Sequence, residues 1–408
     1  MNRKQLTLIL VAMVLAGALG LWLSRREAAS YVTTQGRMGE KVLGEFDINT
    51  VAQVTVRHDT NTLDLAQEND VWVVRQRGGY PANFSEVREF LHKLWDLKVV
   101  QPVALGAADL GRLELAAASG TNAPVVVELK AKDGKVLKTV TLGKKHLRQA
   151  ASPSPFGGDD GWPDGRYLMV DQKPEAVSLV SEPFSNIEPK ADQWLNRDFF
   201  KVEKVKSVAV TYAVATNSWK LERETETGEL KLADAGPEEK LDTAKVSGIP
   251  TALSWPSFTD VIIDPQPAVT GLDKPTVAVL ETFDGFTYTV KVGSRKGEDA
   301  YYLTVDVAAD LPKERAPGKD EKAEDKEKLD KEFKEKTDKL AEKLKQEKAL
   351  GKWTYVVSKY TVDGLLKERH ALLAEKKEEA AKPDAAGGAE DAAAPPMPPL
   401  VPELPPIQ

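Results

Sequence analysis

The sequence predicts an α+β fold, with tandem duplicated domains that have mainly antiparallel sheets and a packed helix each, preceded by one transmembrane helix. Three observations lead to this prediction. Residues 6–23 carry no charge, several later segments alternate apolar and polar residues as half-buried strands do, and the order of these segments recurs in the second half of the chain. Such a recurrence is typical of an internal repeat.

Length and composition are compatible with two folded domains and flanking segments. The chain has 408 residues, of which 41% are apolar and 29% charged, enough for two cores of ordinary size. The mean hydropathy of -0.37 excludes a protein with many membrane spans. A net charge of -7 argues against nucleic-acid binding, which needs a positive surface. Because cysteine is absent, disulfides, thiolate metal sites and cysteine nucleophiles are excluded.

Residues 1–26 are predicted to anchor the chain in the membrane. Their apolar stretch, residues 6–23, would span roughly 27 Å as a helix, close to the hydrocarbon thickness of a bilayer. The alternative is a cleaved signal peptide, but Arg25 and Arg26 stand where a small-residue cleavage site would be needed. We expect a single-pass membrane protein with most of its chain in the periplasm, after a linker at residues 27–45.

The first repeat, residues 46–192, opens with three segments of period two. Their apolar positions are Val51, Val54 and Val56, then Leu63 and Leu65, then Trp72 and Val74. An amphipathic helix follows Pro81, Ala82 and Asn83, with Ser85 as its expected cap and an apolar face formed by Val87, Phe90, Leu91, Leu94 and Leu97. A hairpin turned at Asp133-Gly134 comes next, since Asp-Gly suits a tight turn. Its strands are expected at 124–129 and 140–143, and another strand at 167–170.

The second repeat, residues 193–373, has the same order. Its opening strands carry Val205, Val208 and Val210, then Trp219 and Leu221, then Leu230 and Leu232. A shorter helix, interrupted by Gly248 and Pro250, is expected to follow Asp242 and Thr243 and to carry Val246, Ile249 and Leu253. The second hairpin turns at Asp284-Gly285, between strands at 275–279 and 290–293. Further strands are expected at 302–305 and 353–357.

Two insertions and a tail break the symmetry. Residues 148–164, rich in Ser, Pro, Gly and Asp, predict an exposed loop. Residues 313–352, rich in Lys and Glu, predict a charged helix or a short helical hairpin with a thin apolar stripe of Leu329, Phe333, Leu340 and Leu344. This insertion is either a solvated helix held by i,i+4 pairs or an arm for partner docking. Residues 374–408, rich in Ala and Pro, predict a disordered tail.

Sequence motifs for catalysis and metal binding were not found. The four histidines lack the paired spacing of a metal site: His58, His92, His146 and His370. No nucleophile elbow, Ser-x-x-Lys pair or P-loop occurs. The acidic turn at 159–165 departs from the EF-hand pattern, and the aromatic segment at 194–200 is expected to pack at the domain junction rather than to bind a ligand. We therefore assign no catalytic, cofactor-binding or metal residue and expect no cofactor.

The chain resembles the bacterial DUF4340 family, an uncharacterised domain family. The residues that carry the resemblance are Val51, Val54 and Val56, Trp72 and Val74, the Pro81-Ala82-Asn83 segment, the Asp133-Gly134 hairpin with Leu142-Gly143, and Trp194-Leu195-Asn196-Arg197. It covers most of residues 40–373. The resemblance implies a single-span envelope protein, similar in setting to auxiliary components of gliding-motility-type ABC transporters, and it implies no catalytic residue. The charged insertion and the Pro-rich tail depart from the family pattern.

These observations favour a non-catalytic envelope protein that serves as an accessory or scaffold of an ABC-type transport complex. The expected partners are the membrane, through the N-terminal helix, and transporter subunits. One alternative is a stand-alone module that binds cell-wall glycan or another envelope ligand through Trp and Tyr side chains. Another is a hydrolase whose acidic site is assembled from distant carboxylates. The sequence indicates no oligomeric state. A fold alone does not define a function.

Overall fold

The fold is described from a computed structural model, which covers Gly17 and residues 38–148, 161–294, 300–316 and 323–375. No helix within these ranges is both long enough and apolar enough to cross a membrane. The predicted anchor, apart from Gly17, most of the predicted linker and the predicted tail beyond Glu375 lie outside the described residues. The described part is an α+β fold with two antiparallel sheets and few helices, as the sequence predicts.

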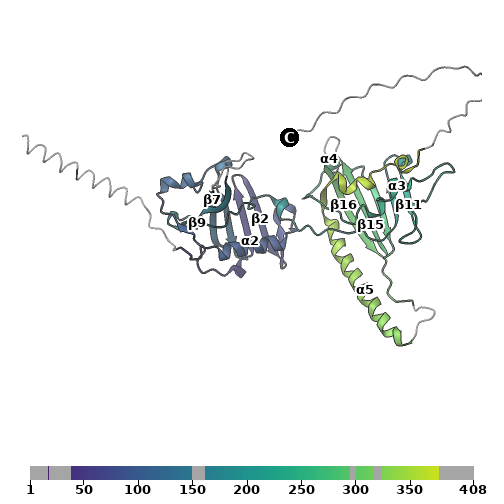
Figure 1. The fold of residues 1–408 in the computed structure, drawn as a ribbon, viewed down its shortest axis with the longest axis horizontal. Helices are drawn as coiled ribbons and strands as arrows, with labels where there is room; N and C mark the ends of the chain where they lie inside the picture. Colours follow the sequence, from purple (N-terminus) through teal and green to yellow (C-terminus); the bar gives the residue numbers. More distant parts are fainter. Residues whose placement is uncertain (1–16, 18–37, 149–160, 295–299, 317–322, 376–408) are drawn as a thin grey trace, which may run out of the picture.

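The first sheet has nine strands in the order β4-β3-β2-β1-β6-β7-β8-β9-β5 (Figure 1). All its neighbouring strands run antiparallel. In chain order the strands are β1 (Gln53–His58), β2 (Asn61–Glu68), β3 (Val71–Val74), β4 (Tyr80–Pro81), β5 (Gln101–Pro102), β6 (Val125–Lys130), β7 (Val136–Arg148), β8 (Trp162–Val170) and β9 (Val177–Val180).

The second sheet has eight strands in the order β12-β11-β10-β14-β15-β16-β17-β13. In chain order they are β10 (Val205–Thr211), β11 (Trp219–Glu222), β12 (Lys231–Leu232), β13 (Asp260–Ile262), β14 (Thr276–Thr282), β15 (Phe286–Ser294), β16 (Ala300–Ala309) and β17 (Thr354–Ser358). Strand for strand, this order equals the order β3-β2-β1-β6-β7-β8-β9-β5 of the first sheet. The two sheets differ at one edge, where β4 extends the first sheet alone.

The helix of the first repeat, α2 (Phe84–Asp96), covers one face of the first sheet (Figure 1). Its buried side chains are Val87, Phe90, Leu91 and Leu94, the predicted apolar face. The expected cap, Ser85, is wrong: Asn83 is the N-cap, and its carboxamide oxygen accepts from the backbone N–H groups of Ser85 and Glu86. The helix begins at Phe84, one residue before Ser85. The side-chain carboxamide of Asn83 is therefore the group that reaches the first free backbone N–H donors.

The corresponding element of the second repeat is a single turn, α3 (Thr243–Val246), capped by Asp242. A 3-10 turn, η8 (Ile249–Thr251), follows it, because Pro250 lacks an N–H and cannot continue an α-helix. The predicted shorter, interrupted helix of the second repeat is therefore one α-helical turn followed by a 3-10 turn. Further short helices of this repeat are α4 (Pro267–Thr270) and α6 (Lys359–Val362).

The remaining 3-10 segments are η1 (Ile48–Thr50), η2 (Arg75–Arg77), η3 (Ala107–Leu113), η4 (Gly120–Asn122), η5 (Pro174–Ala176), η6 (Ala191–Trp194), η7 (Ala215–Asn217), η9 (Leu350–Lys352), η10 (Asp363–Leu365) and η11 (Arg369–Leu372).

The predicted loop at 148–164 is shorter than expected. Strand β7 continues to Arg148 and β8 begins at Trp162, and these two residues pair across the hairpin. The backbone hydrogen bonds of the ladder outweigh the turn-forming composition, so Trp162 to Asp164 are strand residues rather than loop residues. Residues 149–160 lie outside the described part.

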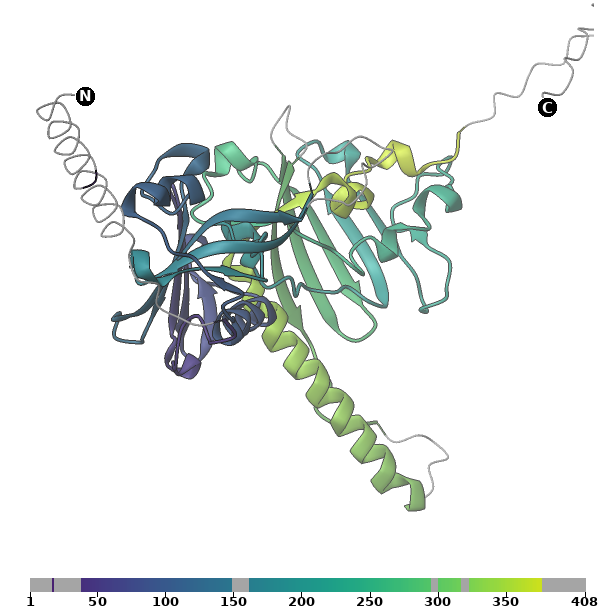
Figure 2. The same ribbon diagram turned by 60° about the vertical axis from the view of Figure 1, so that its left-hand side comes forward.

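The charged insertion is one long helix, α5 (Ala323–Ala349), so the hairpin alternative is wrong. Its C-terminal part lies against β16, and the rest extends away from the sheet (Figure 2). Leu340 and Leu344 of the predicted stripe pack against the core of the second sheet. The helix therefore has an anchored end and a projecting end.

Candidate functional site at the junction of the two sheets

The segment at 194–200 joins the two sheets and packs as the sequence predicts. Trp194, Leu195 and Phe200 are buried, and Leu195 pairs with Ala82 beside β4. Asn196 donates its backbone N–H to the carbonyl of Pro81 at 2.9 Å. The connection between the repeats is thus hydrogen-bonded to the edge of the first sheet.

Tyr80, a residue of the first sheet, packs into the core of the second sheet. This β4 residue is 1% exposed, and its ring packs edge-to-face against three aromatic rings of the second repeat: Phe258 at 5.9 Å, Trp353 at 4.9 Å and Tyr355 at 6.2 Å between centroids. Aromatic pairs of this geometry contribute beyond their buried area. One continuous core therefore extends from the first sheet to the second.

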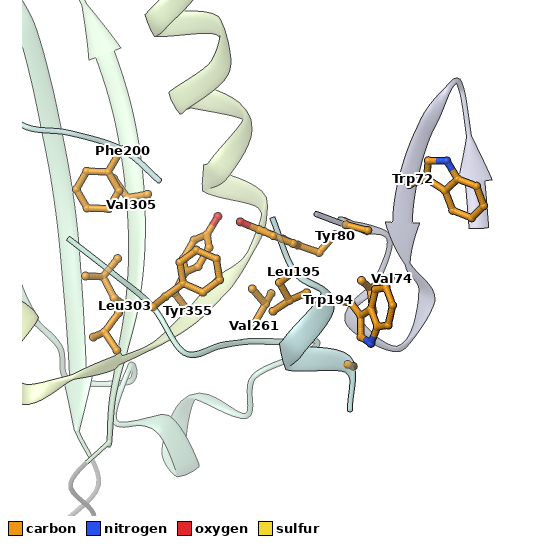
Figure 3. Packing of buried hydrophobic residues seen from close by; sticks show 14 of the residues in the cluster. Trp72, Val74, Tyr80, Trp194, Leu195, Phe200, Val261, Leu303, Val305 and Tyr355 are labelled. Carbon is orange, nitrogen blue, oxygen red and sulfur yellow. The ribbon is translucent and has the colours of Figure 1, made fainter. Parts of the chain in front are cut away.

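The phenol groups of Tyr80 and Tyr355 lie close together inside this core (Figure 3). The Tyr355 hydroxyl donates to the carbonyl of Leu350 at 3.0 Å. Burial raises the pKa of Tyr80 to about 12 and also raises the pKa of Tyr355. Both phenols stay protonated at neutral pH and act as packing groups rather than as acids or bases.

Two arginines fix the edge of the junction. Arg77, just before β4, binds Asp260 of β13 with two parallel hydrogen bonds of 2.7 and 2.8 Å, and this carboxylate raises the pKa of Arg77. Arg197 donates to the carbonyls of Phe258 and Thr259, both at 2.9 Å. A bidentate guanidinium pair defines orientation as well as distance, so the two sheets have a fixed register at this edge.

A cleft of about 770 Å³ opens beside the junction; we call it the junction cleft. The segment after Arg197, the loop at Trp255 and the C-terminal part of α5 line it. Trp255 is 78% exposed, and the ammonium group of Lys201 lies 4.2 Å from the centroid of its ring. Trp255 therefore presents an aromatic ring at the rim of the cleft, with a cation–π contact from Lys201.

Glu347 anchors α5 at the base of this cleft. Its carboxylate is buried and accepts from the backbone N–H of Lys201 at 2.9 Å and from the hydroxyl of Tyr288 at 2.7 Å. The ammonium group of Lys343 is 3.8 Å away. Burial raises the pKa of Glu347, while these donors oppose that shift. Because both oxygens are engaged, the carboxylate holds the helix in place and is not available to a substrate.

The sequence predicts no metal site, because its four histidines lack the spacing of a metal-binding pair. Among the residues that the structure describes, no three His, Asp or Glu side chains lie close enough to hold a metal ion. His146 pairs with Asp164 at 2.7 Å, and Asp164 is the acidic residue of the predicted turn at 159–165 that lies in the described part of the chain. The other histidines stand apart, at the end of β1 for His58, beside Trp95 for His92, and beside Glu368 for His370.

Two carboxylates do meet near the second sheet. Asp234 and Glu239 both bind the guanidinium group of Arg369. Arg369 and the N–H of Gly236 lower the pKa of Glu239 to about 2. A carboxyl group that ionises so readily is a poor general acid, and its partner cation already neutralises it.

The sequence pattern placed the segment at 194–200 at the junction but indicated none of its other residues. Tyr80, Arg77 and Asp260 carry no local motif, since the ion pair joins positions 183 residues apart. Glu347 looks like every other acidic residue of a Lys/Glu-rich helix. The exposed Trp255 is surrounded by Ser and Pro, and this was the one available signal for a surface aromatic side chain.

The fold and the site define a two-sheet α+β protein whose repeats are joined by a buried aromatic core, with a cleft and a projecting helix beside the junction. The model of the family described as a domain of unknown function, DUF4340, matches residues 72–275, half of the chain. The chain belongs to the DUF4340 family. The match begins at β3 and ends before β14, so it includes both sides of the junction. No curated protein and no solved structure matches the chain.

Proposed function

We propose that this protein is a non-catalytic, membrane-anchored envelope protein that serves as an accessory or scaffold of an ABC-type, gliding-motility-like transport complex. The observation that supports this proposal best is the helix α5, which is held rigidly at the junction by one end and projects from the body with the other (Figure 2). A rigid arm is suited to holding a partner at a set distance from the two sheets.

The arm has the chemistry of a protein-binding element. It contains as many lysines as acidic residues, so it has no net charge to attract a nucleic acid or an anionic membrane surface. Its projecting half carries the partly buried Leu329 and Phe333 among exposed charged residues. Apolar positions within a mixed charge pattern give a partner both contact area and register.

A site-specific photo-crosslinker tests the arm in native membranes. It is placed at Glu335, an exposed residue of the projecting half, and, as the matched control, at Glu226, an exposed residue of the second repeat away from the arm. We expect transporter subunits joined to position 335 and not to position 226, identified by mass spectrometry. Recovery of the same proteins from both positions, or of this chain alone, would contradict the proposal.

The exposed Trp255 favours a second candidate, binding of cell-wall glycan, because sugar rings stack on accessible aromatic faces. Trp255→Ala should then reduce retention of the protein on isolated cell wall several-fold. Tyr360→Ala is the matched control, since Tyr360 is 93% exposed but lies outside the junction cleft. Equal retention of both variants and the parent protein would exclude this role for Trp255.

A further inference from the structure

A second cleft, of about 570 Å³, lies between α2 and the segment at 182–194; we call it the α2 cleft. It belongs to the first repeat, and α5 does not line it. Its base is aromatic: the ring of Phe90 packs edge-to-face against Phe184 at 6.1 Å and against Trp194 at 5.8 Å. All three side chains are buried and form a packed aromatic floor.

The indole N–H of Trp194 has no acceptor. Trp194 lines the α2 cleft and is 5% exposed, and its Nε1 is the buried side-chain polar atom, among the residues that the structure describes, without a hydrogen-bond partner. A buried donor that has lost water and gained no acceptor is unfavourable, and native proteins satisfy nearly all such groups. A ligand whose acceptor oxygen reaches this N–H, after a small displacement of the floor side chains, would remove this penalty.

The wall around this floor carries an excess of negative charge. Four glutamates and two lysines line the cleft, and the lysines are engaged by Glu89 at 2.9 Å and by Glu188 at 2.6 Å. Glu86 and Glu182 have no ion-pair partner within the described part of the chain. After Glu89, their charges help to raise the pKa of Lys93. Two carboxylates therefore remain to attract a cation.

A buried arginine, Arg166, is hydrogen-bonded to the segment at 182–194, which lies opposite α2. Arg166 is 8% exposed and donates to the carbonyls of Gly143 at 2.8 Å and Phe184 at 3.1 Å. Burial lowers the pKa of Arg166 to about 10. Phe184 itself has a φ of 46°, which is rare for a bulky residue. The surrounding structure thus imposes a strained conformation on a residue of the floor, as is common at binding sites.

We propose that the α2 cleft binds a basic peptide group, with a guanidinium or ammonium group between Glu86 and Glu182 and a carbonyl oxygen that accepts from the Trp194 indole N–H. An arginine or lysine within a polypeptide supplies the cation, the carbonyl acceptor and an aliphatic stem for the aromatic floor. The source is either a free short peptide or a basic segment of a partner protein. This binding site is independent of the arm.

Calorimetric titration of the full-length protein with capped Gly-Arg-Gly tests the proposal, with capped Gly-Glu-Gly as the control ligand. The basic peptide should bind and the acidic one should not. The double variant E86Q/E182Q should weaken binding by about tenfold or more, and Glu68→Gln, an exposed glutamate on β2, should leave it unchanged. A failure of Gly-Arg-Gly to bind at millimolar concentration, or equal binding by all proteins, would overturn the proposal.

The indole N–H provides a readout that a charge effect alone would not move. In protein labelled with ¹⁵N at the tryptophan indoles, Trp194→Phe identifies the signal of Trp194 by its loss. That signal should shift when Gly-Arg-Gly binds, and Trp194→Phe should weaken binding several-fold. An unmoved Trp194 signal at saturation would overturn the assignment of the acceptor.

A photo-crosslinking amino acid placed at position 86 distinguishes the two sources of the ligand in cells. If crosslinking recovers a protein with a basic segment, the source is a partner; if it recovers peptides alone, the source is a free ligand.

Discussion

Tyr80→Ala is the substitution that should separate the two sheets. Tyr80 belongs to the first sheet, yet its aromatic contacts are all with rings of the second repeat. A buried aromatic side chain of about 150–250 Å² at ~25 cal/mol per Å² gives about 4–6 kcal/mol as an upper limit. Large-to-small substitutions of aromatic core residues cost about 3–5 kcal/mol. We expect the free energy of unfolding to fall by about 3–5 kcal/mol.

Urea unfolding of the full-length chain, followed by tryptophan fluorescence and circular dichroism, measures this change. The parent should unfold in one transition because its core is continuous, whereas Tyr80→Ala should show two transitions as the sheets lose their coupling. Tyr80→Phe keeps the ring and should cost about 1 kcal/mol or less. The fully solvated Tyr360→Ala should change stability by no more than about 0.5 kcal/mol.

If Tyr80→Ala retains a single transition and loses no more stability than Tyr360→Ala, the buried junction does not couple the repeats. The two sheets would then not form one rigid scaffold. Arg77→Ala distinguishes the two contributions at this edge, because it removes the ion pair with Asp260 and leaves the aromatic core intact.

Three further outcomes are expected. The pKa of Glu239 lies well below its ordinary value, so the unfolded chain takes up this proton first and stability falls as the pH drops from about 4.5 toward 2. In urea unfolding at pH 5 and pH 3, the stability of Glu239→Gln should depend less on pH than that of the parent protein. An unchanged pH dependence would contradict the pairing of Glu239 with Arg369. Gly143→Ala would place a Cβ 2.2 Å from the carbonyl oxygen of Leu113 and should cost about 1–3 kcal/mol, with Gly111→Ala, where nothing lies within 4 Å, as the control that must cost less. Asn83→Ala removes the cap of α2 and should cost about 1 kcal/mol by the same measurement; a loss near zero would mean that the cap is replaced by water.

The sheets could be predicted because apolar and polar residues alternate along their strands. Val54 and Val56 are fully buried while Thr55 between them faces Asp64 on the other side, which gives the alternation that sequence patterns detect. The hairpin at Asp133-Gly134 was equally readable, since Gly134 has a φ of 84°. Strands β4, β5, β9 and β13 were not predicted; three of them have only two or three residues and are defined mainly by their partner strands.

The candidate site was beyond the reach of sequence patterns for a related reason. Tyr80 follows two glycines in a turn and looks like any residue before a proline. Its role depends on Tyr355, which lies 275 positions later and is brought close only by the packing of the two repeats. Linear motifs report local geometry, so a site formed where two domains meet has no local signal.

The two copies have kept the same packing rule where they form their sheets and have diverged where they meet. Gly143 and Gly293 occupy matching positions, and at each a Cβ would collide with a backbone carbonyl of a crossing segment, Leu113 in one copy and Thr270 in the other. By contrast, β4 with Tyr80 extends only the first sheet, and α5 is inserted only into the second. Both additions border the junction. The two sheets therefore share the close packing that each needs to fold, and they differ in the elements β4 and α5 that lie at their contact.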